Sequence, residues 1–160
     1  MMPMIRPATP ADVPVMLGFI RDLAAFEREP DAVEATEDML HDALFGAQPA
    51  AEALIAEADG AAIGFAIFYV TFSTWTGRRG LWLDDLYVTP AARGGGAGAA
   101  LLSALAGIAV DRGYARFEWW VLDWNTPAID FYRAKGAVAQ DQWTAQRVDG
   151  DALRVLAGKR

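Results

Sequence analysis

Cysteine is absent from this 160-residue sequence, and histidine occurs once, at position 41. The absence of cysteine excludes disulfide bonds, thiolate catalysis and cysteine metal ligands. One histidine without any cysteine also argues against a transition-metal site, so no metal is expected. His41 falls in a short polar stretch with helical spacing, where we expect its side chain to be solvated.

Long hydrophobic runs and an excess of positive charge are also missing. No uninterrupted apolar stretch reaches the ~18 residues of a membrane span. The opening MMPMIRPATPADV has neither the basic nor the apolar segment of a signal peptide, so a cytoplasmic protein is expected. Lys and Arg number 14 against 21 Asp and Glu, which gives a net charge of −7. This balance argues against nucleic acid and anionic membranes as partners and favours a cationic substrate.

The sequence does contain enough apolar material for one core. Hydrophobic residues make up 54% of it, and the length suits a single domain over residues 1–160. We predict strands at 4–7, 53–57, 62–72, from 81 onward, 116–122 and 143–148, with a turn at Asp59-Gly60 and a loop at 71–80. We predict helices between 12 and 30 and at 36–45, 99–109, 125–135 and 151–157. This order indicates an α/β fold with a mixed, strongly twisted central sheet flanked by helices.

The most informative stretch is LWLDDLYVTPAARGGGAGAALL, residues 81–102, in which a strand, a turn, a glycine loop and a helix follow one another. Glycines allow close approach and positive φ, and a helix start offers unpaired N–H groups, so the stretch predicts a phosphate or pyrophosphate site. A P-loop is excluded because no Gly-Lys-Ser/Thr follows. Gly94, Gly96 and Ala99 also fit G-x-G-x-x-A, with Glu118 about 20 residues on, although residues 89–93 separate these glycines from the strand. A flexible glycine turn is the remaining alternative.

Two motifs carry a resemblance to a known family. Arg93-Gly94-Gly95-Gly96-Ala97-Gly98 resembles the R-x-x-G-x-G/A acetyl-coenzyme A signature of the GNAT N-acetyltransferases. NTPAIDFYRAKGA, at 125–137, resembles that family's N-x-x-A-x-x-F-Y-x-x-x-G helix. The segments IRPATPAD, FSTWTGR, YVTPAARGGGAG and VLDWNTPAIDFY resemble the diamine N-acetyltransferase group, which includes the spermidine/spermine and thialysine Nε-acetyltransferases. The resemblance covers nearly the whole chain and implies a GNAT-like fold, acetyl-CoA as co-substrate, a small amine as acceptor and a homodimer.

Acetyl transfer to an amine requires two proton transfers. An alkylammonium, with a pKa near 10, must lose a proton before it attacks the thioester, and the departing thiolate gains one. The resemblance implies that Tyr132 is the acid and Asp84 the base. Family members usually carry Glu at the position of Asp84, so the shorter side chain favours a bridging water; alternatively, Asp84 and Asp85 only hold the cation. Simple strand alternation predicts that Asp84 shares a face with Trp82 and Leu86, and Asp85 with Leu83 and Tyr87.

The resemblance also implies two binding sets. The residues expected to hold the coenzyme are Leu86, Tyr87, Val88, Arg93, Gly94, Gly95, Gly96, Ala97, Gly98, Ala99, Asn125, Ala128 and Tyr132. Those expected to hold the amine are Phe26, Glu27, Trp75, Asp84, Asp85, Glu118, Trp119 and Trp120, and for each tryptophan core packing is an equal alternative.

Some features depart from the group or leave other functions open. Ser73 stands where the polyamine-preferring branch tends to have Asp, and Ser73-Thr74-Trp75 looks like the thialysine branch, so short amines are expected to be preferred over spermine. The segment 137–142 looks shorter than in the family. A coenzyme-binding sensor without catalysis is the alternative function, and a nucleotide-binding oxidoreductase fragment is a third.

Overall fold

A computed structural model describes residues 2–159, which form two compact units, one ending at Trp120 and one beginning at Val121. The first unit contains β1 (Met4–Pro7), α1 (Val13–Phe26), α2 (Glu37–Phe45), β2 (Glu52–Ala58), β3 (Ala61–Ser73), β4 (Arg78–Val88), α3 (Ala97–Asp111) and β5 (Phe117–Glu118), with 3-10 turns at Pro10–Asp12 and Pro90–Ala92. The second unit contains α4 (Thr126–Ala134) and α5 (Gly150–Leu156). The single domain expected over the chain stays a prediction.

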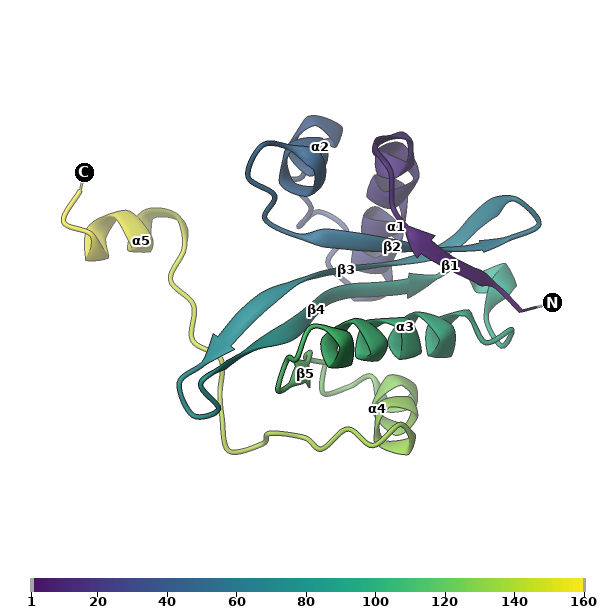
Figure 1. Cartoon of the computed structure of the whole chain (residues 1–160). Helices are drawn as coiled ribbons and strands as arrows, with labels where there is room; N and C mark the ends of the chain where they lie inside the picture. The colour runs from purple at the N-terminus through teal and green to yellow at the C-terminus, as the bar shows by residue number, and fades with distance from the viewer. Residues whose placement is uncertain (1, 160) are drawn as a thin grey trace. The chain divides into compact units, whose positions relative to one another are not determined.

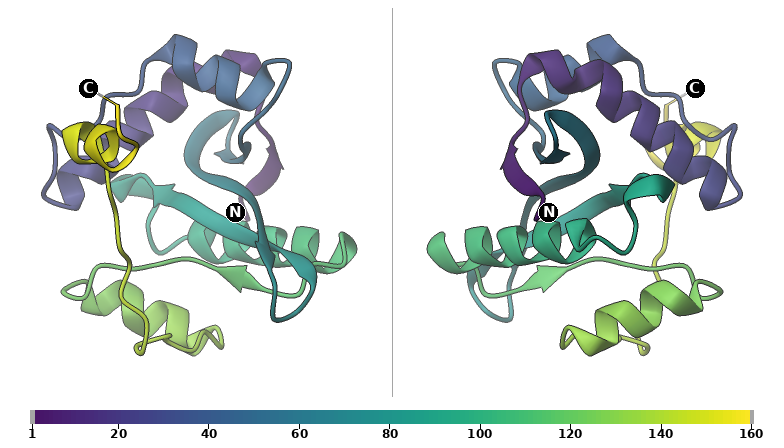
Figure 2. Two further views of the ribbon diagram at one scale, coloured as in Figure 1. Left: turned by 90° about the vertical axis from the view of Figure 1, so that its left-hand side faces the viewer. Right: turned by 90° about the vertical axis from the view of Figure 1, so that its right-hand side faces the viewer.

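The strands of the first unit form one sheet in the order β1-β2-β3-β4-β5. Neighbours from β1 to β4 are antiparallel, whereas β5 runs parallel to β4. α1 and α2 lie over one face of the twisted sheet and α3 over the other (Figure 1 and Figure 2). The predicted α/β class, with a mixed sheet between helices, is therefore confirmed.

Local sequence signals place most of the element ends correctly. The Thr36 hydroxyl accepts a hydrogen bond from the Met39 N–H at 3.2 Å and so caps α2, which ends at Gly46 as predicted. Asp59 and Gly60 both have positive φ, 52° and 76°, as the two-residue turn between β2 and β3 requires. The ends of α2 and the first hairpin could therefore be predicted from capping and turn residues.

The core on the α1 face packs helix side chains against β2, β3 and β4. Phe19 of α1 lies 5.6 Å, centroid to centroid, from Phe65 of β3 and 5.5 Å from Tyr87 of β4. On the α3 side, Leu101 and Leu105 are completely buried. Burying such side chains contributes about 1.5–3 kcal/mol each, which fixes α1 and β4 relative to one another.

Four predicted elements need correction. β3 and β4 extend far into the loop expected at 71–80, so that only residues 74–77 remain as a turn, because the strand pairs continue to Ser73–Arg78. The strand expected at 116–122 is confined to Phe117–Glu118, since its parallel ladder with β4 ends at Trp82. No strand forms at 143–148 among residues 2–159. The helix expected at 99–109 begins at Ala97 and ends at Asp111.

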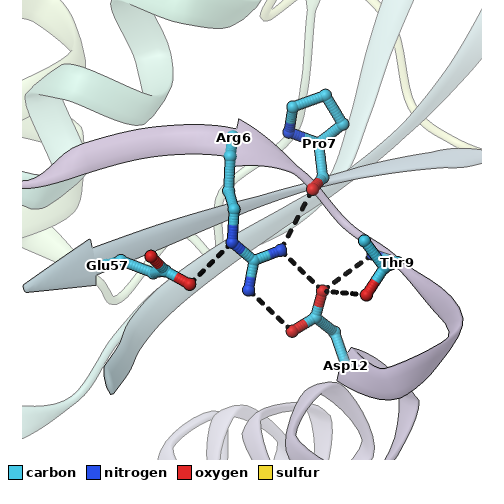
Figure 3. Close-up of polar contacts among 5 residues, drawn as sticks. All are labelled: Arg6, Pro7, Thr9, Asp12 and Glu57. Atoms are coloured by element: carbon cyan, nitrogen blue, oxygen red, sulfur yellow. Dashed lines mark hydrogen bonds and ion pairs between the residues drawn. The ribbon is translucent and has the colours of Figure 1, made fainter. Parts of the chain in front are cut away.

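A polar cluster ties β1, β2 and the start of α1 together (Figure 3). Arg6 donates to both carboxylate oxygens of Asp12, at 2.7 and 2.8 Å, and to Glu57 at 2.6 Å. Asp12, only 8% exposed, also accepts from the N–H of Thr9 at 2.7 Å. The hydrogen bonds from Arg6 lower the pKa of Asp12 to about 2.

Asp12→Asn is expected to destabilise the protein at pH 7 by about 1–3 kcal/mol, because the Arg6 guanidinium loses its bidentate partner. The folded pKa lies below the unfolded value of about 3.9, so the contribution of Asp12 is present above that value and is lost as pH falls toward 2. Urea unfolding at pH 7 and pH 3 measures both effects. Glu52→Gln, which breaks the exposed pair with Arg112, is the control and should cost less than about 1 kcal/mol. Equal losses for the two variants would contradict the structural role of Asp12.

Candidate functional site

A β-bulge in β4 brings two carboxylates to one region. Trp82 pairs with Tyr69 of β3 and Asp85 pairs with Ile67, while Asp84 falls in the irregularity between these pairs. Tyr69 and Ile67 are two residues apart on β3, so Trp82 and Asp85 share a face of the sheet, the one that α1 covers. The prediction that Asp85 shares a face with Tyr87 is confirmed, since Tyr87 pairs with Phe65 on that same face. The prediction that Asp85 shares a face with Leu83, and that Trp82 lies on the other face, is wrong because the bulge adds one residue between Leu83 and Asp85.

Three carboxylates form a mutually repelling cluster at this bulge. Burial, together with the charges of Asp84 and Glu27, raises the pKa of Asp85 from 3.8 to about 7. Burial also raises the pKa of Asp84, and burial with the charge of Asp84 raises that of Glu27, which follows the last residue of α1. None of the ion pairs within residues 2–159 includes these three groups. Such a cluster favours a cation, or a proton in its place.

Two aromatic side chains that the sequence interpretation missed border the carboxylates. Burial and the charge of Asp84 raise the pKa of Tyr69, so its hydroxyl lies within the field of that carboxylate. Trp82, opposite Tyr69, meets Trp120 edge to face at 5.6 Å between ring centroids. Tyr69 could have been found from the alternation along β3, which sets it on the face of Phe65 and Ile67. Aromatic faces beside carboxylates suit an alkylammonium ion.

The predicted phosphate loop has the conformation of an anion cradle. Gly94 and Gly96 have φ of 85° and 88°, and no atom lies within 4 Å of a Cβ built at either position. Gly96 is the N-cap of α3, and the first N–H to close the helix is that of Ala100, at 2.9 Å from the Gly96 carbonyl. The N–H groups of Ala97, Gly98 and Ala99 therefore have no acceptor within the helix. Open space beside donors at the positive end of a helix suits phosphate oxygens.

The end of β4 beside this loop has an open backbone edge. β5 pairs with β4 only at Leu81 and Trp82, so within the described part of the chain no strand covers Leu86–Val88 on that side. An extended ligand can add to such an edge as a further strand. The Tyr87 side chain is buried against α1, which leaves its backbone as the group that a ligand could meet.

Arg93 begins the glycine loop, and its side chain has partners within the protein. Its Nε donates to the Val88 carbonyl oxygen at 3.1 Å. Its guanidinium carbon lies 5.6 Å from the ring centroid of Phe26 and 5.7 Å from that of Tyr87. Arg93 thus contacts the ends of both α1 and β4.

The remaining predicted residues lie in other places. In the first unit, Trp75 occupies the β3–β4 turn and is 79% exposed. Glu118 of β5 pairs with Trp82 of β4 in the parallel ladder. The centroid of the Trp119 ring lies 4.8 Å from that of Phe117. A hollow of about 340 Å³ in the first unit contains none of the predicted residues; its lining is Leu17, Arg21, Thr36, Glu37 and Asp38.

The second unit carries the predicted helix α4. The Asn125 Oδ1 accepts from the Ala128 N–H at 3.4 Å and caps the helix, as predicted. The helix ends in paired bonds, from Gly136 N–H to the Arg133 carbonyl at 3.0 Å and from Ala137 N–H to the Tyr132 carbonyl at 3.1 Å, with Gly136 at a φ of 98°. Tyr132 is half-buried, with its ring 5.5 Å from that of Phe131.

No group of three or more His, Asp or Glu side chains in residues 2–159 could hold a metal ion. Over the same residues, no helix combines the length and apolar character needed to cross a membrane.

Comparison with known sequences agrees with the two motifs. Residues 18–137 match the family described as acetyltransferase (GNAT) family. The chain is 38% identical to thialysine N-epsilon-acetyltransferase of Sus scrofa, over 98% of each sequence. It is 36% identical to spermidine/spermine N(1)-acetyltransferase-like protein 1 of Homo sapiens, over 96% of this chain and 23% of that protein. It is 29% identical to an L-ornithine N5-acetyltransferase of Arabidopsis thaliana, over 95% of this chain and 86% of that protein.

Solved structures share the fold. An integron cassette protein from the mobile metagenome of V. cholerae superposes with a TM-score of 0.81 and 25% identity, over 98% of each chain. An aminoglycoside acetyltransferase from an uncultured soil sample gives a TM-score of 0.76 and 19% identity, over 92% of this chain and 96% of the other. The second likeness shows the fold alone.

Proposed function

The chain belongs to the acetyltransferase (GNAT) family, and we propose that it transfers an acetyl group from acetyl-CoA to the primary amine of a small cationic substrate. The substrate class that we propose is a lysine analogue such as thialysine, a diamine or a polyamine. The observation that carries the proposal is the cluster of Glu27, Asp84 and Asp85, which lies in the same unit as the anion cradle of Gly94–Gly96. Relatives named for thialysine and ornithine support this class of amine.

The donor site consists of backbone groups supplied by β4 and the glycine loop. Coenzyme A carries a pyrophosphate and an extended pantetheine arm, and the arrangement fits both. The N–H groups of Gly94–Ala99 would hold the pyrophosphate, with Arg93 adding positive charge, and the edge at Leu86–Val88 would pair with the arm. Asn125 and Ala128 would border the end of the arm nearest the thioester. Acetyl-CoA, when bound, supplies the acyl group as that thioester.

The acceptor site combines negative charge with aromatic surface. Glu27, Asp84 and Asp85 attract the ammonium group, and the net charge of −7 raises the encounter rate of cations. The further residues that we propose for the amine are Phe26, Trp75, Glu118, Trp119 and Trp120. We also propose Tyr69, because it lies in the field of Asp84, and Trp82, because its ring meets that of Trp120. The carboxylates have raised pKa values, so each accepts a proton more readily than an exposed carboxylate does. We propose that Asp84, through water, or the adjacent Asp85 takes the proton from the ammonium group, and that Tyr132 returns one to the thiolate.

Release of free thiol from acetyl-CoA tests the function directly. The protein is mixed with acetyl-CoA and with thialysine, ornithine, spermidine or spermine, and mass spectrometry identifies the acetylated product. We expect turnover with at least one of these amines, and a fluorescence titration is expected to show binding of acetyl-CoA but not of NAD. Tight binding of acetyl-CoA without turnover on any amine would instead support a coenzyme-binding sensor.

Gly96→Val is expected to weaken acetyl-CoA binding about 100-fold while the protein stays folded. A valine at a φ of 88° is strained by about 1–3 kcal/mol, and its side chain enters the open space of the cradle. Calorimetry gives the dissociation constant, and thermal unfolding gives the stability. Gly113→Val is the matched control, because Gly113 also has positive φ (72°) and open space but lies after the far end of α3. Unchanged affinity in Gly96→Val would disprove this placement of the pyrophosphate.

Ser73→Asp is expected to raise kcat/KM for spermine about two- to fivefold relative to that for thialysine, as for one exposed ion pair. The Ser73 hydroxyl accepts from the N–H groups of Trp75 and Thr76 at 3.2 and 3.3 Å, and a carboxylate can keep both bonds while adding charge. Thialysine should be the better substrate of the wild type, and salt should raise the KM of both amines. The comparison is kcat/KM for both amines on both proteins at two salt concentrations. A wild type that prefers spermine would contradict this interpretation of Ser73.

We also propose that the protein forms a homodimer in the cytoplasm. Large apolar side chains are exposed along the second unit, namely Val138, Trp143, Val148, Leu153, Val155 and Leu156. Exposed apolar surface of this kind is typical of protein interfaces. Light scattering at micromolar concentration tests the dimer, and a monomer at all concentrations would exclude it.

A further inference from the structure

Arg93 contacts three parts of the first unit that are far apart in sequence. Its backbone begins the glycine loop, its Nε bonds to the carbonyl oxygen that ends β4, and its guanidinium lies against the last residue of α1. A second ring, that of Tyr87, borders the same guanidinium at 5.7 Å. A planar guanidinium can meet ring faces and donate along its edge at the same time, whereas a lysine ammonium cannot reproduce that geometry.

The contact with Phe26 matters because of the residue that follows it. Glu27 leaves the end of α1 with its N–H bonded to the Leu23 carbonyl at 2.9 Å, and its carboxyl group lies within the field of Asp84. The Phe26 side chain is 47% exposed, and the guanidinium is one of the groups that fix it. Phe26 is the last residue of α1, so a contact that holds its ring also restrains the backbone from which the Glu27 side chain extends.

We propose that Arg93 is a positioning residue that ties the donor loop to the acceptor-binding end of α1. By holding Phe26, it sets Glu27 opposite Asp84 and Asp85 and so serves amine binding, in addition to adding charge near the phosphate loop. This role rests on the proposed function, since it assigns the three carboxylates to the amine. It gives this arginine two separable effects, one on the donor and one on the acceptor.

A double-mutant cycle separates the two effects. Arg93→Met and Phe26→Leu should each raise the KM for the amine about three- to fivefold, as for the loss of a cation–π contact. The double variant should be no worse than Arg93→Met alone, because both changes break the same contact. The dissociation constant of acetyl-CoA should rise in Arg93→Met and stay unchanged in Phe26→Leu. Arg93→Lys should restore donor affinity but not the KM for the amine.

Additive effects in the cycle, or recovery of both constants by lysine, would show that Arg93 acts only through its charge. Arg112→Met is the matched control, since Arg112 also stacks on a ring, that of Tyr114 at 5.9 Å, and pairs with Glu52. This variant should leave both constants at wild-type values.

Hydrogen exchange of the unliganded protein tests the same link without any reaction. The amides of Glu27 and Glu29, bonded to the Leu23 and Ala24 carbonyls at 2.9 Å, should exchange faster in Arg93→Met, while those of β2 stay unchanged. Unchanged exchange at residues 27–29 would overturn the proposal. A wild type that acetylates no amine would defeat the proposed function, and the exchange comparison would still decide whether Arg93 holds α1.

Discussion

Replacing Tyr132 with phenylalanine should lower kcat about 10²–10⁴-fold, the usual contribution of a general acid. The substitution removes one phenolic proton and keeps the ring, so the packing against Phe131 within α4 remains. Acetyl-CoA affinity should stay within about twofold of wild type, because the donor is held by backbone groups of the glycine loop. A stopped-flow assay of thiol release at saturating amine gives kcat, and calorimetry gives the affinity.

Tyr114→Phe is the control for this substitution. Tyr114 follows α3, and its hydroxyl accepts from Arg112 at 3.4 Å, outside the proposed site. Wild-type kcat in Tyr114→Phe together with the large loss in Tyr132→Phe would assign the proton to Tyr132. A kcat within twofold of wild type in Tyr132→Phe would mean that water or another group protonates the thiolate.

The parts of the fold that follow local rules could be predicted from the sequence. The Thr36 cap, the Asp59-Gly60 turn and the Gly136 stop each depend on one or two residues whose backbone preferences are strong. The glycine loop was equally predictable, because Gly94 and Gly96 adopt the positive φ that only glycine tolerates readily.

The geometry of the carboxylates could not be predicted in the same way. A bulge depends on the pairing of β4 with β3, and no residue type near Asp84 predicts it from the sequence. The prediction therefore identified both aspartates but placed Asp85 with Leu83, whereas Asp85 lies on the face of Trp82 and Tyr87. Tyr69 and Trp82 were not predicted as site residues, because the position of Tyr69 near Asp84 and that of Trp82 on the face of Asp85 depend on the register between β3 and β4 rather than on a motif.

The contacts of Arg93 show a second limit. The motif identified this arginine by its place before the glycines, which indicated a phosphate partner. Arg93 contacts Val88, five positions earlier in the sequence, and Phe26, 67 positions earlier. Only the tertiary structure brings Phe26 close to Arg93. The strand expected at 143–148 does not form, because within residues 2–159 no strand pairs with this segment.

In the wild type, kcat/KM should rise with pH through a midpoint near 7. In Asp85→Asn this rise should be absent. Asp85 is protonated below that pH because burial and the charges of Asp84 and Glu27 oppose its ionisation, and only the ionised form accepts a proton or pairs with an ammonium. Asp84→Asn should move the midpoint to lower pH, because one repelling charge disappears. The midpoint belongs to the coupled cluster of Glu27, Asp84 and Asp85 rather than to Asp85 alone.

The effect of Asp84→Asn on kcat and on KM distinguishes the two roles proposed for Asp84, which are proton relay and binding of the cation. If it relays the proton, Asp84→Asn should lower kcat at pH 8 by about 10²–10⁴-fold. If it only holds the cation, KM should rise and kcat should stay close to wild type. Glu34→Gln is a control for the loss of one acidic charge, since Glu34 lies in the segment between α1 and α2 and has no proposed role. A pH profile unchanged in both Asp84→Asn and Asp85→Asn would remove these carboxylates from the reaction.

Stability gives an independent measurement of the same cluster. The folded pKa of Asp85, about 7, lies above its unfolded value of about 3.9, so the folded protein binds more protons than the unfolded chain between these values. The free energy of unfolding should therefore fall as pH rises from 4 through 7, the opposite of the effect of Asp12. Asp85→Asn should flatten this fall, because an amide requires no deprotonation in the buried site. Urea unfolding at pH 5 and pH 8 measures it, and an equal fall in wild type and variant would show that Asp85 titrates normally.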